Sequence, residues 1–317
     1  MRPVHYILIG AVAGIALVFL LSSSVVDSIS NRTDRSSIDS LENLGDENTM
    51  AKYFAIKLPK SVSFAGEVVP MSDIEVRERL DRELLVNTYW HSNTLQNLKL
   101  AHRWFPEIEK IFAENGIPDD FKYIALAESG LRNVVSPAKA EGVWQFLSET
   151  GKQYGLKINA EIDERYDVER STYAAVKYFK DAYGKFNNWT LTAAAYNAGM
   201  GAIENSLKYQ EVNSYYDLYL NQETSRYIFR IIAFKTIYEN TEKFGFMLDD
   251  EDLYKPLAFT TIVAKKSIPN LAEFAIENNT TYKMLRYYNP WMQSTSLTIN
   301  PGETFIIKLP LEKSAEE

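Results

Sequence analysis

The sequence contains no cysteine and only three histidines, so most thiol and metal chemistry is excluded. Without cysteine the chain has no disulfides, no thiolate zinc site, no cysteine nucleophile and no lipidated N-terminal cysteine. Basic residues are also in the minority, with 34 Lys and Arg against 42 Asp and Glu, and the net charge of -8 gives no general attraction for nucleic acid. No spacing in the chain indicates a metal, nucleotide or redox cofactor. We therefore expect carboxylate chemistry, no cofactor, no metal and no nucleic-acid partner.

Charged residues are absent from residues 3–26, although Arg2 lies directly before this stretch. At about 1.5 Å per residue, a helix of this length can cross the roughly 30 Å hydrocarbon layer of a membrane. The positive charge in front and the acidic residues behind predict that the amino end stays in the cytoplasm and the rest is exported. A cleaved signal peptide is the alternative, because Ser22 and Ser24 have the small side chains that cleavage needs. The polar residues 27–52 are predicted to form a flexible linker.

The folded part begins near residue 53 and starts with helical patterns. Ser72 and Glu75 have the spacing of a capping box, which predicts a helix from Ser72 to about Trp90. A second helix is predicted from residue 93 or 94 up to Gly116, because apolar residues recur at spacings of three and four. Further helical patterns cover residues 119–129, 171–183, 190–198 and 224–239.

These patterns separate a helical part of the chain from a C-terminal region that also contains β-like runs. We expect residues 53–115 to be a helical part that packs on a mainly α domain of residues 116–250. Residues 257–311 instead contain two β-like runs, AFTTIVA and ETFIIKLP, around two short helical patterns at residues 270–278 and 281–288. This pattern predicts a small β-α-α-β domain, and its length is near the minimum for independent folding.

One carboxylate lies in line with the apolar face of a predicted helix. In the segment DDFKYIALAESG, Phe121, Ile124, Ala125 and Glu128 fall at positions i, i+3, i+4 and i+7. We expect Glu128 to point toward the core side of a cleft, where burial raises the pKa of a carboxyl and suits it to act as a general acid. The alternative is that Glu128 turns toward water in the last helical turn before Gly130.

Several separated segments occur in the order found in one enzyme family. They are AESGL, SPAKAEGVWQF, DERYDVERSTYAA, AAYNAGMGAI and ETSRYIFRI. With them the chain resembles the catalytic domain of soluble-type lytic murein transglycosylases, especially the membrane-bound D type. The resemblance implies a lysozyme-like, mainly α catalytic domain that cleaves the β-1,4 bond between N-acetylmuramic acid and N-acetylglucosamine and leaves 1,6-anhydromuramic acid ends. It also implies a place in the cell envelope on the periplasmic face, anchored by residues 3–26 if these are not cleaved, with peptidoglycan glycan strands as the substrate.

The resemblance also assigns roles to individual residues. Glu128 corresponds to the family's single catalytic acid and base, and no second carboxylate is needed, because the N-acetyl group of the sugar is expected to act as the nucleophile. Ser129 and Glu223 have structural alternatives, as a hydroxyl bonded to the helix backbone and as an acid at a helix amino end. Trp144 and Tyr196 have the alternative of core packing. The residues assigned to substrate binding or to support of the site are Ser129, Trp144, Gln145, Tyr196, Asn197, Glu223 and Tyr227.

Residues 257–311 resemble a LysM module, a β-α-α-β fold that binds chains containing N-acetylglucosamine. The matching pieces are LAEFAIENNTTYKMLRYYNP and INPGETFIIKLP, whereas the family's Gly-Asp-Thr-Leu turn is replaced by KSIPNL. Tyr287, Tyr288 and Trp291 either stack on sugar rings or form the core of this small domain.

Two other functions stay open at this point. A goose-type hydrolytic muramidase would use the same acid but deliver water, positioned by a carboxylate such as Asp163, Asp167 or Glu141. A non-catalytic peptidoglycan-binding protein is the third possibility, and the intact set of Glu128 with its predicted substrate-binding residues argues against it. The sequence identifies no protein partner.

Overall fold

The computed structural model describes residues 55–311, of which residues 56–311 belong to one compact unit. The predicted membrane segment, residues 1–26, and the predicted linker, residues 27–52, lie outside the described residues. Between residues 55 and 311, no helix is long and apolar enough to cross a membrane. The predicted domain boundaries at residues 115, 250 and 257 stay predictions.

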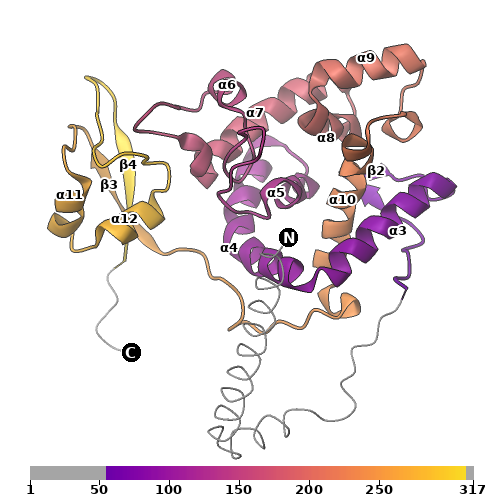
Figure 1. Cartoon of the computed structure of the whole chain (residues 1–317), viewed down its shortest axis with the longest axis horizontal. Coiled ribbons are helices and arrows are strands. Elements are labelled where there is room, and N and C mark those ends of the chain that lie inside the picture. Colours follow the sequence, from indigo (N-terminus) through magenta and orange to yellow (C-terminus); the bar gives the residue numbers. More distant parts are fainter. Residues whose placement is uncertain (1–54, 312–317) are drawn as a thin grey trace, which may run out of the picture. The chain divides into compact units, whose positions relative to one another are not determined.

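The larger part of the described chain is helical, which confirms the predicted fold class (Figure 1). It opens with a two-stranded hairpin and continues through helices and short 3-10 turns. These elements are β1 (Ser63–Phe64), β2 (Glu67–Val68), α3 (Ile74–Tyr89), α4 (His91–Asn115), η1 (Asp119–Phe121), α5 (Lys122–Ser129), α6 (Ser148–Gln153), η2 (Glu164–Tyr166), α7 (Val168–Phe186), α8 (Trp189–Ala198), α9 (Met200–Gln210), η3 (Tyr215–Asp217), α10 (Gln222–Tyr238) and η4 (Thr241–Phe244).

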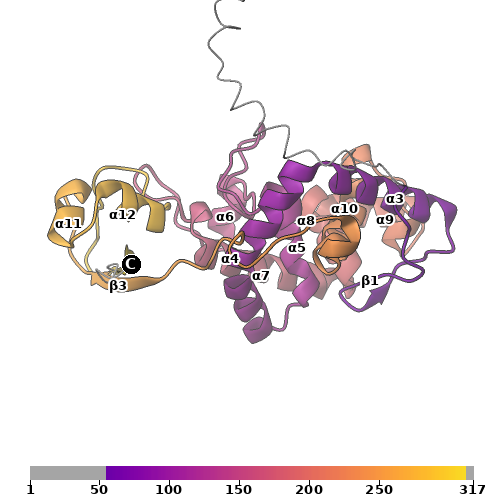
Figure 2. The same cartoon turned by 90° about the horizontal axis from the view of Figure 1, so that it is seen from below.

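The short helix α5 lies among α4, α7, α8 and α10 (Figures 1 and 2). Its apolar side is buried, and Phe121 at its start is fully enclosed. The ring of Phe121 contacts Phe179 of α7 and Trp189 of α8 at centroid distances of 4.7 and 5.2 Å. Aromatic rings therefore fix the helix that carries Glu128 from two sides.

The first two helices differ from the prediction at their starts. Asp73, not Ser72, is the N-cap of α3, and its carboxylate accepts a hydrogen bond of 2.8 Å from the backbone N–H of Glu75. The predicted capping box is therefore wrong by one residue, because the extended backbone at Asp73 places the nearer carboxylate on the free N–H groups. Helix α4 begins at His91, two residues early, and ends as predicted at Gly116 in the left-handed conformation.

The hairpin of β1 and β2 holds the amino end of α8. The carboxylate of Glu67 accepts hydrogen bonds from the backbone N–H groups of Trp189 (2.6 Å) and Thr190 (2.9 Å), and from the Thr190 hydroxyl (2.7 Å). These N–H groups have no partner within the helix, and the amino end of a helix attracts negative charge. The hairpin thus stabilises the helix that carries Tyr196 and Asn197.

We expect Glu67→Gln to lower the free energy of unfolding by about 1 to 2 kcal/mol, because the neutral amide loses the charge that favours the helix end. Urea unfolding followed by circular dichroism measures this. Glu78 is exposed on α3, and Glu78→Gln serves as the control for which little change is expected. Equal stability of the two variants would mean that the hairpin does not hold α8.

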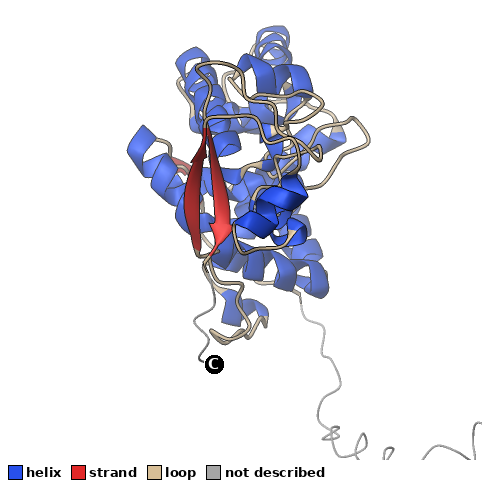
Figure 3. Ribbon diagram, turned by 90° about the vertical axis from the view of Figure 1, so that its left-hand side faces the viewer, coloured by secondary structure: helices blue, strands red, loops and turns tan. Residues whose placement is uncertain are grey.

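The C-terminal unit has the predicted β-α-α-β order. Strand β3 (Phe259–Ala264) pairs antiparallel with β4 (Phe305–Pro310), so that Ala264 lies opposite Phe305 (Figure 3). Helices α11 (Leu271–Glu277) and α12 (Tyr282–Tyr288) connect the strands. Trp291 is buried and stacks on Phe305 at 5.5 Å, which supports its reading as a core residue.

The core of this unit also includes a residue from the helical part. Ile162, in the loop before η2, is 1% exposed and belongs to the same apolar cluster as Leu271 and Trp291. Two backbone hydrogen bonds accompany this apolar contact. Asp163 donates its N–H to the Trp291 carbonyl (2.8 Å), and Gln293 donates its N–H to the Glu161 carbonyl (2.7 Å). The loop of residues 157–163 is thus joined to the C-terminal unit by apolar packing and by backbone hydrogen bonds.

Candidate active site

Glu128 lies in the last turn of α5 and faces α10. The helix ends there because Gly130 adopts the left-handed conformation, with φ of +60°, and donates its N–H back to Leu126. The Glu128 side chain is partly buried and accepts a short hydrogen bond from the hydroxyl of Tyr227 on α10. Tyr227 itself is almost fully buried. The carboxyl is therefore held at one oxygen by a neutral phenol.

The surroundings of Glu128 favour its protonated form. Burial raises the pKa of Glu128 to about 7, and the negative charge of Glu223 adds to this rise. The Tyr227 hydrogen bond and the positive charge of Arg230 act in the opposite direction and lower the pKa. A carboxyl with this pKa can hold a proton at neutral pH and can also give it up, which is what a single acid and base requires.

Tyr196 and Asn197 lie at the end of α8. Burial raises the pKa of Tyr196 well above its ordinary value, and the nearby charge of Glu128 contributes, so its phenol stays neutral. The hydroxyl of Tyr196 donates to the backbone carbonyl of Trp144 (2.7 Å). The side-chain oxygen of Asn197 accepts a hydrogen bond of 2.9 Å from Thr224, which ties α8 to the first turn of α10.

The predicted Trp-Gln stretch forms a loop whose side chains mostly serve the loop itself. Trp144 is fully buried, and its indole N–H donates to the hydroxyl of Thr172 (2.9 Å). The amide nitrogen of Gln145, at φ of +51°, donates to the carbonyls of Val134 and Gly142 at 2.9 and 2.8 Å. These contacts support the core-packing reading of Trp144. They leave the amide oxygen of Gln145 as the group that a ligand could reach.

Ser129 and Glu223 also adopt their structural alternatives. The hydroxyl of Ser129 donates to the backbone carbonyls of Val143 (2.7 Å) and Ala125 (3.2 Å). It thereby joins the end of α5 to the Trp144 loop. Glu223 is exposed in the first turn of α10 and influences Glu128 through its charge rather than through contact.

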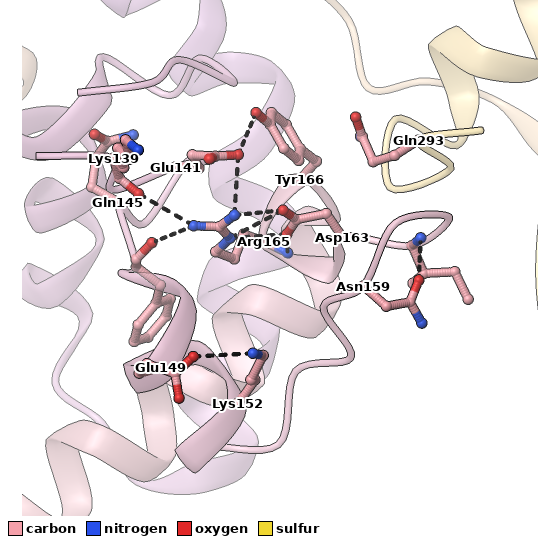
Figure 4. A network of polar contacts seen from close by, with 12 residues as sticks. Lys139, Glu141, Gln145, Glu149, Lys152, Asn159, Asp163, Arg165, Tyr166 and Gln293 are labelled. Carbon is pink, nitrogen blue, oxygen red and sulfur yellow. Dashed lines mark hydrogen bonds and ion pairs between the residues drawn. The ribbon is translucent and has the colours of Figure 1, made fainter. Parts of the chain in front are cut away.

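A buried arginine holds the same loop from the other side (Figure 4). Arg165 is 5% exposed and forms an ion pair with Asp163 at 2.6 Å and another with Glu141 at 3.1 Å. Its guanidinium also donates to the backbone carbonyl of Phe146 (3.1 Å). The hydroxyl of Tyr166 completes the network by donating to Glu141 (2.7 Å). All these groups are satisfied, so the network is rigid support for the loop.

The structure thus brings Glu128, Tyr227 and Tyr196 together. Asn197 is joined to α10, the helix of Tyr227, by its hydrogen bond from Thr224. Arg230 and Arg165 were not predicted from the sequence. Arg230 lies three residues after Tyr227 and therefore on the same face of α10, a spacing that could have identified it. Arg165 pairs with Asp163, two residues earlier, but its contacts with Glu141 and Phe146 join separate loops and carried no local signal. Among residues 55–311, no group of three His, Asp or Glu side chains is arranged to hold a metal ion.

The hydroxyl of Tyr227 lowers the pKa of Glu128 by donating to its charged form. We therefore expect Tyr227→Phe to move the titration midpoint of Glu128 from about 7 to a higher pH. Titration of the glutamate side chains by ¹³C NMR measures this midpoint, and the spectrum of Glu128→Gln identifies the signal. An unchanged or lower midpoint would mean that the phenol does not stabilise the carboxylate.

Comparison with known proteins finds two family matches within the chain. Residues 107–218 match the family described as transglycosylase SLT domain, and residues 260–313 match the soluble lytic transglycosylase C-terminal LysM-like domain. The membrane-bound lytic murein transglycosylase D of Escherichia coli strain K12 is 27% identical over 244 residues, which cover 74% of this chain and 52% of the relative. The protein of the same name from Escherichia coli O6:H1 gives the same values. The chain spans about half the length of these curated relatives.

Two solved structures are also similar over part of the chain. The crystal structure of the 70 kDa soluble lytic transglycosylase of Escherichia coli has 19% identity and a TM-score of 0.39, over 56% of this chain and 33% of that chain. An inactive mutant of the lytic transglycosylase Slt of Pseudomonas aeruginosa has 20% identity and a TM-score of 0.35, over 48% and 26%. From the family matches we conclude that residues 107–218 form a transglycosylase SLT domain and residues 260–313 a soluble lytic transglycosylase C-terminal LysM-like domain.

Proposed function

We propose that this protein is an exported lytic transglycosylase that cleaves the β-1,4 bond between N-acetylmuramic acid and N-acetylglucosamine in peptidoglycan. The observation that supports this most is Glu128, a partly buried carboxyl within the SLT domain whose pKa is raised to about 7. A group of this kind can protonate a leaving oxygen near neutral pH.

The proposed reaction needs one carboxyl and consumes no water. Glu128 gives its proton to the glycosidic oxygen as the bond from this oxygen to C1 of the muramoyl sugar breaks, and the sugar's own N-acetyl group supports C1. The muramoyl 6-hydroxyl then bonds to C1 and gives its proton to the Glu128 carboxylate, which restores the acid. A pKa of about 7 serves both steps, because it leaves the proton transferable in either direction.

Neutral groups around Glu128 would bind the sugar. The hydroxyl of Tyr196 and the amide of Asn197 lie in the last turn of α8, and the amide oxygen of Gln145 can accept from a sugar hydroxyl. Ser129, Trp144 and Tyr227 position these groups, and Glu223 keeps the pKa of Glu128 high. The LysM-like domain would bind glycan strands containing N-acetylglucosamine.

A hydrolytic muramidase is less well supported, because the carboxylates that would hold its water are already used. Asp163 and Glu141 pair with Arg165. Asp167 caps α7 by accepting from the N–H of Arg170 (3.0 Å). None of the three is thus available to activate water without breaking a structural contact.

The cell envelope is the proposed location, on the periplasmic face. This rests on the family of the SLT domain, on the similarity to a relative named as membrane-bound, and on the uncharged residues 3–26. If that segment is not cleaved, it would anchor the protein in the membrane.

Product analysis tests the proposed function. The chain from residue 51 onward would be incubated with purified peptidoglycan and the released muropeptides read by mass spectrometry. Products lighter than reducing sugars by one water are expected. Reducing-end products would make the protein a hydrolase, and no products, with the wall still bound in a pull-down, would favour a non-catalytic binding protein.

A further inference from the structure

A buried acid outside the SLT domain is surrounded by arginines. Glu83 on α3 is only 1% exposed. Its carboxylate forms ion pairs with Arg226 at 2.6 Å and with Arg230 at 3.7 Å, both on α10, and with its neighbour Arg82 at 2.9 Å. A buried charge is tolerated only when it is paired in this way. The three pairs account for Glu83 and fix the two arginines of α10.

Helix α10 also reaches the candidate catalytic acid. Tyr227 directly follows Arg226 and donates to Glu128, and Arg230 lies one turn further on. Helices α3 and α10 run side by side (Figure 1). One stretch of α10 therefore contacts Glu83 on one side and Glu128 on the other.

We propose that Glu83 is a positioning residue that holds Arg226 and Arg230 on α10 and balances the charge of Arg230 near the Glu128 carboxyl. The assignment of its role in turnover rests on the proposed function. Glu83 lies before residue 107, so the segment in front of the SLT domain contributes to the site.

The sign of the effect follows from the charges that face each carboxyl. Glu128 is influenced by Arg230 and Glu223 and by the phenols of Tyr227 and Tyr196, all on α10 or α8. Arg230 lowers the pKa of Glu128, and the paired Glu83 offsets part of that charge. Removing the Glu83 charge leaves Arg230 unbalanced, so the Glu128 carboxylate becomes more favourable.

The test is the titration midpoint of Glu128 by ¹³C NMR in matched variants. Glu83→Gln is expected to lower the midpoint by about 0.5 to 1 pH unit, because the shape is kept and the charge is lost. Glu83→Asp keeps the charge and should restore a midpoint near that of the unmodified chain. Glu78→Gln makes the same chemical change at an exposed position of α3 and should leave the midpoint unchanged.

Arg230→Gln provides a second route if Glu83→Gln fails to fold. It removes the positive charge itself, so the midpoint should rise rather than fall. A folded Glu83→Gln with lower thermal stability but an unchanged midpoint would overturn the proposal and leave a purely structural role. An unchanged midpoint in Arg230→Gln would overturn it as well.

The pH dependence of peptidoglycan turnover gives a second test of the proposal. Because the acid must be protonated, activity falls above its pKa, and Glu83→Gln should move this fall to lower pH by the same amount as the NMR midpoint. If the unmodified chain has no activity, the proposed function fails, whereas the titration still decides the role of Glu83.

Discussion

Glu128→Gln is expected to lower peptidoglycan turnover by roughly 10²- to 10⁴-fold while leaving the fold intact. The amide has the shape of the protonated carboxyl and can still accept from Tyr227, but it has no acidic proton to transfer. Release of soluble muropeptides over time measures the effect. Glu149, exposed in the first turn of α6, offers the matched control, because Glu149→Gln makes the same change away from the site.

The same variant should be more stable at alkaline pH. The pKa of Glu128 is raised from the ordinary 4.5 to about 7 in the folded chain, so the folded state binds this proton more tightly than the unfolded state. The resulting stability is complete below about pH 4.5 and is lost as the pH rises through about 7, a loss on the order of 3 kcal/mol.

Gln does not titrate, so Glu128→Gln should unfold at higher urea concentration than the unmodified chain at about pH 8. The two chains should differ least near pH 4.5. A residual activity near that of the unmodified chain would remove Glu128 from the mechanism. A stability difference independent of pH would show that its pKa is not raised.

Gly142→Ala is expected to destabilise the fold by about 3 kcal/mol or more. Gly142 lies at φ of +81°, which L residues rarely adopt, and an added Cβ would meet the backbone oxygen of Arg165 at 1.9 Å. Neither backbone can move easily, because Gly142 donates its N–H to Val134 and Arg165 is held by Asp163. The loop of Trp144 and Gln145 would have to shift, so activity should fall together with stability.

Gly184→Ala is the matched control for this prediction. Gly184 is exposed within α7, and an added Cβ would meet no atom within 4 Å. This substitution should stabilise the helix by about 0.5 to 1 kcal/mol. Urea unfolding of both variants gives the comparison. A Gly142→Ala chain as stable as the unmodified one would contradict the close approach of the two backbones.

Most helices followed from the sequence because their signals are local. The periodicity of Leu98, Ala101, Phe105 and Phe112 predicted α4, and Gly116 marked its end. Helix α9 was not predicted, because Ile203 is its only buried residue among Met200–Gln210 and its apolar face is limited to Met200, Ile203 and Leu207. Helix α6 was missed because six residues are too few for a period.

The position of Glu128 also followed from local periodicity, whereas its partners did not. Arg230 pairs with Glu83 and Arg165 pairs with Glu141 across segments far apart in the sequence, and no single stretch indicates which charges meet. The reading of Trp144 depended on the same kind of information. Its indole bond to Thr172 joins residues 28 apart, and the sequence left substrate binding and core packing equally open.

The packing of Ile162 into the C-terminal core has a consequence for the exchange of domains between related proteins. The two family matches cover residues 107–218 and 260–313. The apolar core of the second region nevertheless includes Ile162, which belongs to the first. A C-terminal domain taken from a relative would come without the loop residue that packs in its own core. Ile162 of the recipient chain would then face water. Exchange of the C-terminal domain therefore has to include the loop of residues 157–163. The helical part and the C-terminal domain should unfold in one cooperative transition.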